Sequence, residues 1–143
     1  MNGEISLTMT FDAGHRIVGH KGKCARLHGH TYKVHILCQG KVKDPGFVVD
    51  FGDIKDLVNE WDHQMLLWID DPLWGPQGNP NKREQLLGSF GCLCLAFNPT
   101  AENMAAYLAK KIVRTFGLIS TQVTLWETPN CSATYYWNAS YVD

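Results

Sequence analysis

The sequence predicts an α+β domain in which an antiparallel four-stranded sheet carries two helices on one face. Three observations support this prediction. Apolar and polar residues alternate in two runs near the start of the chain, two middle segments repeat apolar residues at helical spacing, and two more alternating runs close the chain. Strands that flank a pair of helices are typical of a two-layer arrangement. The expected order is β-β-α-α-β-β.

The length and composition fit a single domain spanning residues 1–143. The chain is 45% hydrophobic and 19% charged, as in globular proteins and unlike disordered or collagen-like chains. Its formal net charge of -1 provides no basic surface for nucleic acid, and no apolar run is long enough to span a bilayer. The five scattered cysteines and the absence of a signal-peptide pattern favour a cytoplasmic protein with a small-molecule partner.

The first two strands are expected at residues 5–11 and 30–38. In both runs every second residue is apolar, as in a strand that buries one face. The segment 14–23 between them is long for a hairpin loop, and loops of this kind are candidates for function.

Two helices and two further strands follow. The first helix is expected to begin near Asp50 and to carry its apolar stripe to Trp61. The second has Thr100 as a plausible N-cap and Gly117 at its C-terminal end. The last strands are expected around the alternating runs that centre on residues 123–127 and 133–137.

Residues 70–98 do not fit this pattern and are interpreted as an insertion in the single domain. The segment begins with turn-forming residues and ends with the apolar run LCLAF at 93–97, which could form a short strand.

Three histidines form the clearest candidate site. His28 and His30 flank Gly29, so their side chains share one face where a strand begins, and His15 can reach them from the preceding strand. Three histidines with no obvious fourth protein ligand suit a Zn²⁺ site with an open position, which is the pattern of catalytic zinc. The alternative is a turn into a strand with solvated imidazoles.

Three further residues are candidates for proton transfer. Cys24 precedes His28 by four residues, so a nearby cation can lower its pKa; the alternative is a small buried hydrophobe. Asp62 and His63 directly follow the first helix, and a carboxylate beside an imidazole fixes its tautomer. The pair can serve one site only if the helix ends there; otherwise it is a solvated helix end.

Glu127 shares a strand face with Val123 and Leu125 if the alternation holds. A buried carboxylate can accept two parallel hydrogen bonds, from an arginine or from the ring N–H and exocyclic amine of a pterin or guanine. The alternative is a strand end at which Glu127 turns to water. Glu102 is less distinctive, because an acid in the first turn of a helix is expected from the helix dipole alone.

Taken in order, these motifs resemble those of the 6-pyruvoyltetrahydropterin synthase family. They are FDAGH at 11–15, CARLHGH at 24–30, DH at 62–63, PTAEN at 99–103 and ET at 127–128. Within that family, the C-x3-H-G-H spacing resembles the bacterial 6-carboxytetrahydropterin synthases of queuosine biosynthesis.

The resemblance implies a T-fold, in which subunits join their sheets around a symmetry axis into a barrel. Such homo-oligomers are usually trimers stacked as a hexamer, with active sites at subunit interfaces. The residues implied by the matching motifs are the zinc ligands His15, His28 and His30, the proton-transfer groups Cys24, Asp62 and His63, and the pterin-binding Glu127 with Thr100 and Glu102 near it.

The activity implied is a zinc-dependent lyase reaction. It converts 7,8-dihydroneopterin triphosphate to 6-carboxy-5,6,7,8-tetrahydropterin, acetaldehyde and triphosphate, with Zn²⁺ as Lewis acid. One alternative is 6-pyruvoyltetrahydropterin synthase or another dihydropterin side-chain lyase. A second, from a different class, is a non-catalytic zinc- and pterin-binding module, which would not need the proton-transfer groups.

Residues 70–98 make the chain longer than compact family members by roughly 20 residues and are expected to border the site or a subunit interface.

Overall fold

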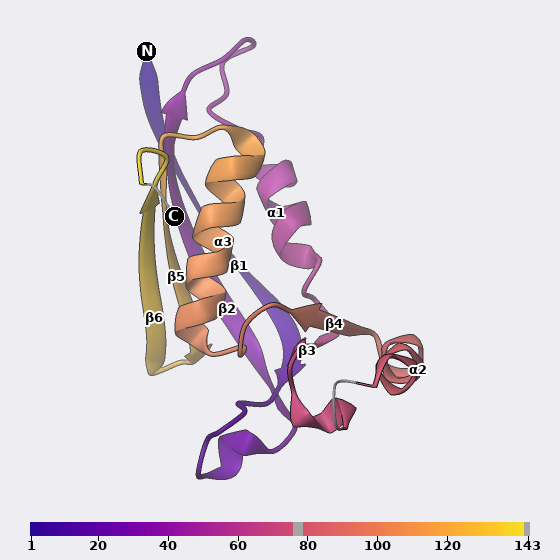
Figure 1. Cartoon of the computed structure of the whole chain (residues 1–143). Helices are drawn as coiled ribbons and strands as arrows, with labels where there is room; N and C mark the ends of the chain where they lie inside the picture. Colours follow the sequence, from indigo (N-terminus) through magenta and orange to yellow (C-terminus); the bar gives the residue numbers. More distant parts are fainter. Residues whose placement is uncertain (76–78, 142–143) are drawn as a thin grey trace.

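The computed structural model describes residues 1–75 and 79–141, which form a curved six-stranded sheet with helices packed on it (Figure 1). The described elements are, in chain order, β1 (Asn2–His15), the short 3-10 helix η1 (Lys23–Ala25), β2 (His28–Lys41), α1 (Phe51–Asn59), β3 (Gln64–Trp68), the 3-10 helix η2 (Pro72–Trp74), α2 (Pro80–Phe90), β4 (Cys92–Leu95), α3 (Ala101–Phe116), β5 (Ser120–Thr128) and β6 (Cys131–Asn138). Across the sheet the order is β4-β3-β1-β2-β5-β6.

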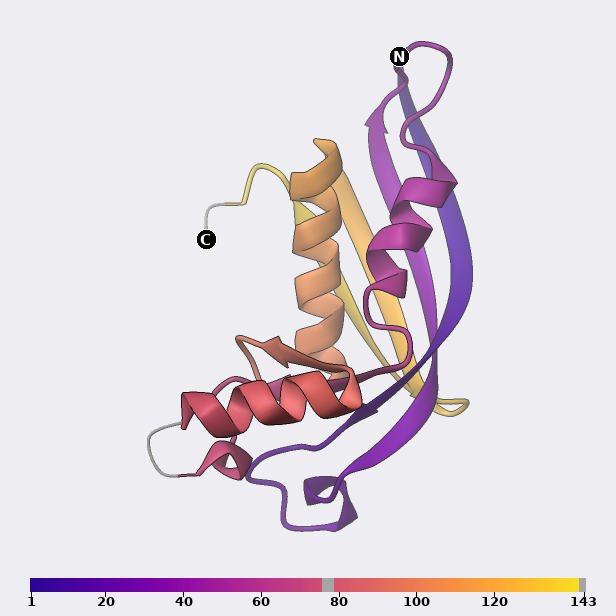
Figure 2. The ribbon, with the colours of Figure 1, turned by 90° about the vertical axis from the view of Figure 1, so that its right-hand side faces the viewer.

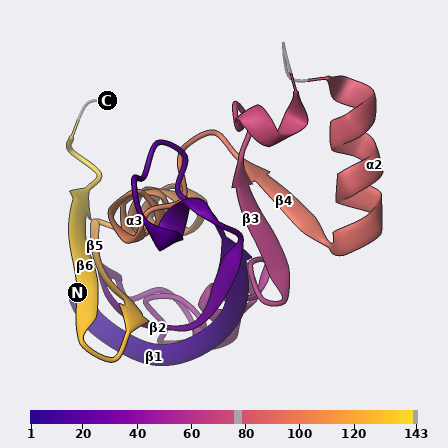
Figure 3. The ribbon, with the colours of Figure 1, turned by 90° about the horizontal axis from the view of Figure 1, so that it is seen from below.

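A long antiparallel ladder between β1 and β2 forms the centre of the sheet. It runs in continuous register from Asn2 opposite Lys41 to His15 opposite His28. β2 pairs with β5, and β5 with β6, also antiparallel. Seen from below, β1 and β2 curve around α3 (Figure 3). Because side chains alternate between the two faces, this register decides which residues meet on the concave face.

Burial confirms the alternation predicted for the first strands. In β2, Tyr32 and Val34 are buried, whereas Thr31 and Lys33 are exposed. The buried face packs against α1 and α3 (Figure 2). The inward residues of these helices belong to the same core and include Ile54, Leu57, Val58, Met104, Leu108 and Ile112. Burial of apolar surface stabilises a fold by about 25 cal/mol per Å², so this shared core holds the two layers together.

Both expected helices begin where the sequence indicates and α3 also ends there, whereas α1 ends at Asn59, two residues before Trp61, to which its stripe was expected to run. The Asp50 side chain caps α1 by accepting the Gly52 N–H at 2.7 Å. The Thr100 hydroxyl caps α3 by accepting the Asn103 N–H at 3.3 Å. At the other end of α3, Gly117 has a φ of 62°, a left-handed conformation that favours glycine.

The sheet differs from the prediction in strand number and in direction. It has six strands instead of four, and it is mixed, because β3 runs parallel to the end of β1 and β4 runs parallel to β3. β3 was missed because its QMLLW sequence is a short, largely apolar run, which has no period of two when a parallel strand is buried on both faces. The short strand considered within 93–97 is confirmed as β4.

A third α-helix, α2, lies within the predicted insertion. Its sequence is mostly polar and exposed and contains Gly88, so it has no apolar stripe at helical spacing from which to predict it. Its N-terminus has a clear local cause, since the Asn79 side chain accepts the N–H groups of Asn81 and Lys82. In the ranges that the structure describes, no helix combines the length and apolarity needed to cross a membrane.

Candidate metal centre and active site

The β1–β2 register brings the three predicted histidines together at one end of the ladder. His15 lies directly opposite His28, and Ala13 lies opposite His30. The ring centroids are 4.6 Å apart for His15 and His28, 5.2 Å for His15 and His30, and 4.9 Å for His28 and His30. The expectation that His15 reaches the other two across an antiparallel pair is therefore confirmed.

Backbone carbonyls orient two of these rings. His15 Nδ1 lies 2.8 Å from the Pro99 carbonyl oxygen, and His28 Nδ1 lies 2.6 Å from that of Arg26. A carbonyl oxygen only accepts hydrogen bonds, so Nδ1 carries the hydrogen in both rings and Nε2 keeps its lone pair. This tautomer is the one in which Nε2 binds a metal ion.

The Nε2 atoms of all three histidines are buried, and none makes a hydrogen bond to any residue that the structure describes. An unsatisfied buried polar atom costs about 1–3 kcal/mol, so three in one place call for an explanation. Burial also lowers the pKa of His15 and His30, which favours the neutral imidazole that binds metals. These residues fit a metal ion, and together with Glu127 they form a group that could hold one.

Glu127 extends the site beyond the three histidines. One carboxylate oxygen, Oε1, lies 3.0 Å from His15 Nε2 and 3.2 Å from His30 Nε2. Glu127 faces inward as predicted, at a register shift between Trp126 and Thr128 that marks a bulge in the β5–β6 pairing. The sequence showed no obvious fourth protein ligand, because Glu127 is almost a hundred positions from His30 and only the fold brings them together.

The second predicted group, Asp62 and His63, follows α1 in a turn. The helix ends at Asn59, and His63 has a φ of 58°. Asp62 Oδ2 lies 2.8 Å from His63 Nδ1, so the two side chains are paired. The condition that the helix must end before the pair is therefore met.

Asp12 anchors this pair to β1 through both of its backbone groups. Its N–H donates to Asp62 Oδ1 at 2.8 Å, and its carbonyl accepts the His63 N–H at 2.7 Å. The Asp12 bond and the His63 side chain lower the pKa of Asp62. The Asp62 hydrogen bond, and to a smaller extent the Asp12 carboxylate, raise the pKa of His63. Asp12 lies within the FDAGH motif, but the sequence alone indicated no role for it.

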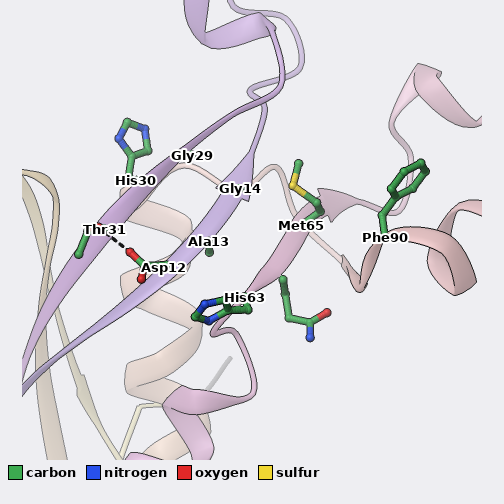
Figure 4. Close-up of a pocket in the computed structure, with 10 residues that line it drawn as sticks. Asp12, Ala13, Gly14, Gly29, His30, Thr31, His63, Met65 and Phe90 are labelled. Carbon is green, nitrogen blue, oxygen red and sulfur yellow. Dashed lines mark hydrogen bonds between the residues drawn. The ribbon is translucent and has the colours of Figure 1, made fainter.

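His63 lines a pocket of about 470 Å³ together with Asp12, Thr31, Met65 and Phe90 (Figure 4). The Thr31 hydroxyl donates to Asp12 Oδ1. In Figure 4 the His30 ring projects from one side of the ladder, whereas Thr31, Asp12 and His63 lie on the other. Within one chain, the His30 ring and His63 therefore lie on opposite sides of the ladder, although both residues line this pocket.

Segment 70–98, which was expected to border the site or an interface, contributes to this pocket through Phe90. It is also tied to the loop that follows β1, because Arg16 Nε lies 3.4 Å from Oδ2 of the buried Asp71. The neighbouring Asn98 side chain exchanges two hydrogen bonds with the backbone of Val18, at 3.0 and 2.8 Å. The loop after His15 is thus held from two sides.

In the described chain, the remaining predicted residues make no hydrogen bond to the three histidines. Cys24 lies half-buried in η1, its carbonyl accepts the Ile17 N–H, and its thiol is not part of the metal-binding group. The Thr100 hydroxyl is used as the cap of α3, and Glu102 is exposed in the first turn of that helix. The PTAEN motif contacts the metal-binding group through the Pro99 carbonyl.

Comparisons with known proteins agree along the chain. A family model described as 6-pyruvoyl tetrahydropterin synthase matches residues 4–138. A protein from Rickettsia bellii named 6-carboxy-5,6,7,8-tetrahydropterin synthase is 40% identical, and the alignment covers 85% of this chain and 91% of that one. A protein of the same name from Haemophilus influenzae is 32% identical, with 92% of this chain and 97% of that one covered.

Solved structures show the same fold. The 6-pyruvoyl tetrahydropterin synthase from Plasmodium vivax superposes with a TM-score of 0.67 at 21% identity, covering 96% of this chain and 99% of that one. An uncharacterized protein from Wolinella succinogenes gives a TM-score of 0.70 at 21% identity, covering 95% and 98%. The expected α+β T-fold is confirmed, with the two added strands noted above. The chain belongs to the 6-pyruvoyl tetrahydropterin synthase family.

Proposed function

We propose that this protein is a zinc-dependent lyase that converts 7,8-dihydroneopterin triphosphate to 6-carboxy-5,6,7,8-tetrahydropterin, acetaldehyde and triphosphate, as a step in queuosine biosynthesis. The observation that carries the proposal is the set of three buried Nε2 atoms without hydrogen-bond partners in the described chain, with Glu127 beside them. The names of relatives at 32–40% identity support this reaction over others in the family.

In this proposal His15, His28 and His30 hold the zinc ion, because neutral imidazoles are ligands that zinc prefers. When bound, zinc supplies a Lewis acid that makes the hydroxyl protons of the substrate side chain and the adjacent C–H easier to remove. The carbonyls of Pro99 and Arg26 keep two of these rings oriented and in the metal-binding tautomer.

Proton transfer falls to Cys24 and His63. Cys24 acts as the base, from the loop that precedes His28. Asp62 holds His63 through Nδ1, so Nε2 remains to exchange a proton with the substrate as the opposing acid or base. The raised pKa of His63 favours its protonated form at the start of such a step.

Glu127 anchors the pterin ring by accepting hydrogen bonds from a ring N–H and the exocyclic amine, with Thr100 and Glu102 near it. A carboxylate can accept two such bonds side by side. Its side chain is 28% exposed, so it remains open to a ligand while it faces the histidines.

A second copy of the chain completes the site. The His30 ring and His63 lie on opposite sides of the β1–β2 ladder, so in this proposal a second copy brings a proton-transfer group to the histidine side. Besides the short outer edge of β4, the described sheet has two longer edges available for pairing: the outer edge of β6, and the edge of β1 before Ala13, where pairing with β3 begins. Joining such edges around an axis gives the barrel of a trimer, and two trimers give a hexamer, with the sites between subunits.

We place the reaction in the cytoplasm, because all five cysteines are free thiols, as is usual in a reducing compartment.

The test is to incubate the purified, zinc-loaded protein with 7,8-dihydroneopterin triphosphate and to identify the pterin product by mass. The proposal expects carboxytetrahydropterin together with acetaldehyde. Pyruvoyltetrahydropterin instead would assign the protein to the other reaction of its family. Zinc binding and pterin binding without turnover would favour a binding module.

A further inference from the structure

The segment 70–98 returns to His63 through two backbone connections. The Met65 N–H donates to the Gly91 carbonyl at 2.9 Å, and β3 pairs in parallel with β4 from Met65 opposite Cys92 onward. Phe90, the last residue of α2, directly precedes Gly91, which has a φ of 57°. The backbone that carries Phe90 is therefore fixed beside the strand that begins at the Asp62–His63 turn.

Met65 is fixed on its other side by β1. A Cβ atom at Gly14 would lie only 2.2 Å from Met65 Sδ, so the thioether packs directly on the backbone of Gly14, one residue before His15. Phe90 differs from Met65 in that 64% of its surface is exposed. An exposed aromatic ring at the mouth of a pocket offers apolar surface to a ligand.

The pocket has two chemically different ends. Asp12, Thr31 and His63 provide polar groups at one end, and Met65 and Phe90 provide apolar surface at the other. Phe90 and Met65 also line a second, apolar cavity of about 630 Å³, together with Leu67 and Leu73. The two residues therefore form an apolar wall that is shared by both cavities.

The roles proposed above for Glu127 and His63 indicate which part of the substrate lies against Phe90 and Met65. The pterin ring is assigned to Glu127, on the histidine side of a subunit interface, while His63 exchanges protons with the C6 side chain. Groups beside His63 are therefore beside that side chain. Resting on this proposed function, we infer that Phe90 and Met65 form a wall that packs against the carbon chain of the C6 substituent and determines which dihydropterins are accepted.

The inference is tested with two ligands and three variants. The ligands are 7,8-dihydroneopterin triphosphate as substrate and 7,8-dihydropterin, which lacks the C6 side chain, as competitive inhibitor. The variants are Phe90→Ala, Phe90→Leu and the control Phe47→Ala, whose side chain is 54% exposed and lines a different cavity, beside Gly3 and Val42. Zinc content and Tm are measured for each protein.

Phe90→Ala is expected to raise KM for the substrate roughly tenfold with kcat within about twofold, because the contact is made equally in the ground and transition states. Phe90→Leu restores most of the affinity, and Phe47→Ala changes neither constant. The Ki of 7,8-dihydropterin stays unchanged in all variants.

An unchanged KM in Phe90→Ala would overturn the inference, and so would a parallel rise in KM and Ki, since that would place the contact on the ring. These outcomes are distinct from failure of the proposed function. The proposed function fails on the wild-type protein alone, through a different pterin product or through pterin binding without turnover, whereas the wall is judged by the difference between Phe90→Ala and the wild type.

Discussion

His15 and His28 lie opposite each other at the last pair of the β1–β2 ladder, with ring centroids 4.6 Å apart. Each Nδ1 is bound to a backbone carbonyl, and each Nε2 is buried without a hydrogen-bond partner in the described chain. The two imidazoles are therefore oriented for a metal ion by the backbone.

Replacing His28 with Ala should abolish stoichiometric zinc binding, because it removes one of three converging imidazoles. Zinc per chain, measured by atomic emission after dialysis, should fall from near one to below about a tenth, consistent with the loss of a ligand. The matched control is His35→Ala on the same strand, whose ring bonds Thr8 on the opposite face of the sheet. Equal zinc content in both variants would show that the metal is held elsewhere.

Glu127→Gln separates the two roles open to this carboxylate. If Glu127 anchors the pterin, it is not needed for zinc binding, and the zinc content should stay near the wild-type value. The affinity for the pterin ring should fall roughly 10- to 100-fold, because a pair of charge-assisted hydrogen bonds is lost. Ring affinity is measured by calorimetric titration with 7,8-dihydropterin. Loss of zinc together with ring affinity would instead identify Glu127 as a metal ligand.

Asp62→Asn should lower the pKa of His63, since Asp62 is the main cause of its elevation. In the wild type, the pairing with Asp62 favours the protonated imidazole of His63. The stabilisation of the folded protein by this pair is therefore complete below the unfolded pKa of 6.5, and it is lost as the pH rises through the elevated pKa of the folded state. NMR titration of the His63 ring protons should show a midpoint at lower pH in the variant. Asp53→Asn, in the first turn of α1, should leave that midpoint in place.

Asp71→Ala should destabilise the protein by about 1–2 kcal/mol, because it removes the buried acceptor of the Leu73 N–H and the negative charge beside the partly exposed Arg16. Asp71 is 2% exposed, pairs with Arg16 and also accepts the Leu73 N–H. Urea denaturation gives the free energy of unfolding. Asp70→Ala, at the exposed neighbouring position, should change it by less than about 0.5 kcal/mol. Similar losses in both variants would mean that the ion pair adds little.

The strands and helices that could be predicted from the sequence are those that bury one face and expose the other. β2 alternates because one side packs on the helices, and α3 has a cap at each end and one apolar stripe. β3 and α2 lack these signals. The first is short and apolar, and the second packs so little of its surface that its sequence remains mostly polar.

The candidate site was predictable where its groups are close in sequence. His28 and His30 share a strand face by spacing alone, and Asp62 is next to His63. The role of Asp12 as the anchor of Asp62 and His63 was not predictable, because it makes those two bonds with its backbone N–H and carbonyl, which any residue type has. The sequence also could not show that the His30 ring and His63 lie on opposite sides of the ladder, since that depends on how β3 joins β1.

The continuous register of the β1–β2 ladder makes metal binding a check on correct strand pairing. A slip of one residue would turn every side chain of β2 to the other face, carrying His28 and His30 away from His15. Any ion that needs all three imidazoles would then bind only the correctly paired hairpin. A bound ion would thus select the native pairing from its shifted alternatives and penalise every misaligned hairpin by the full binding free energy.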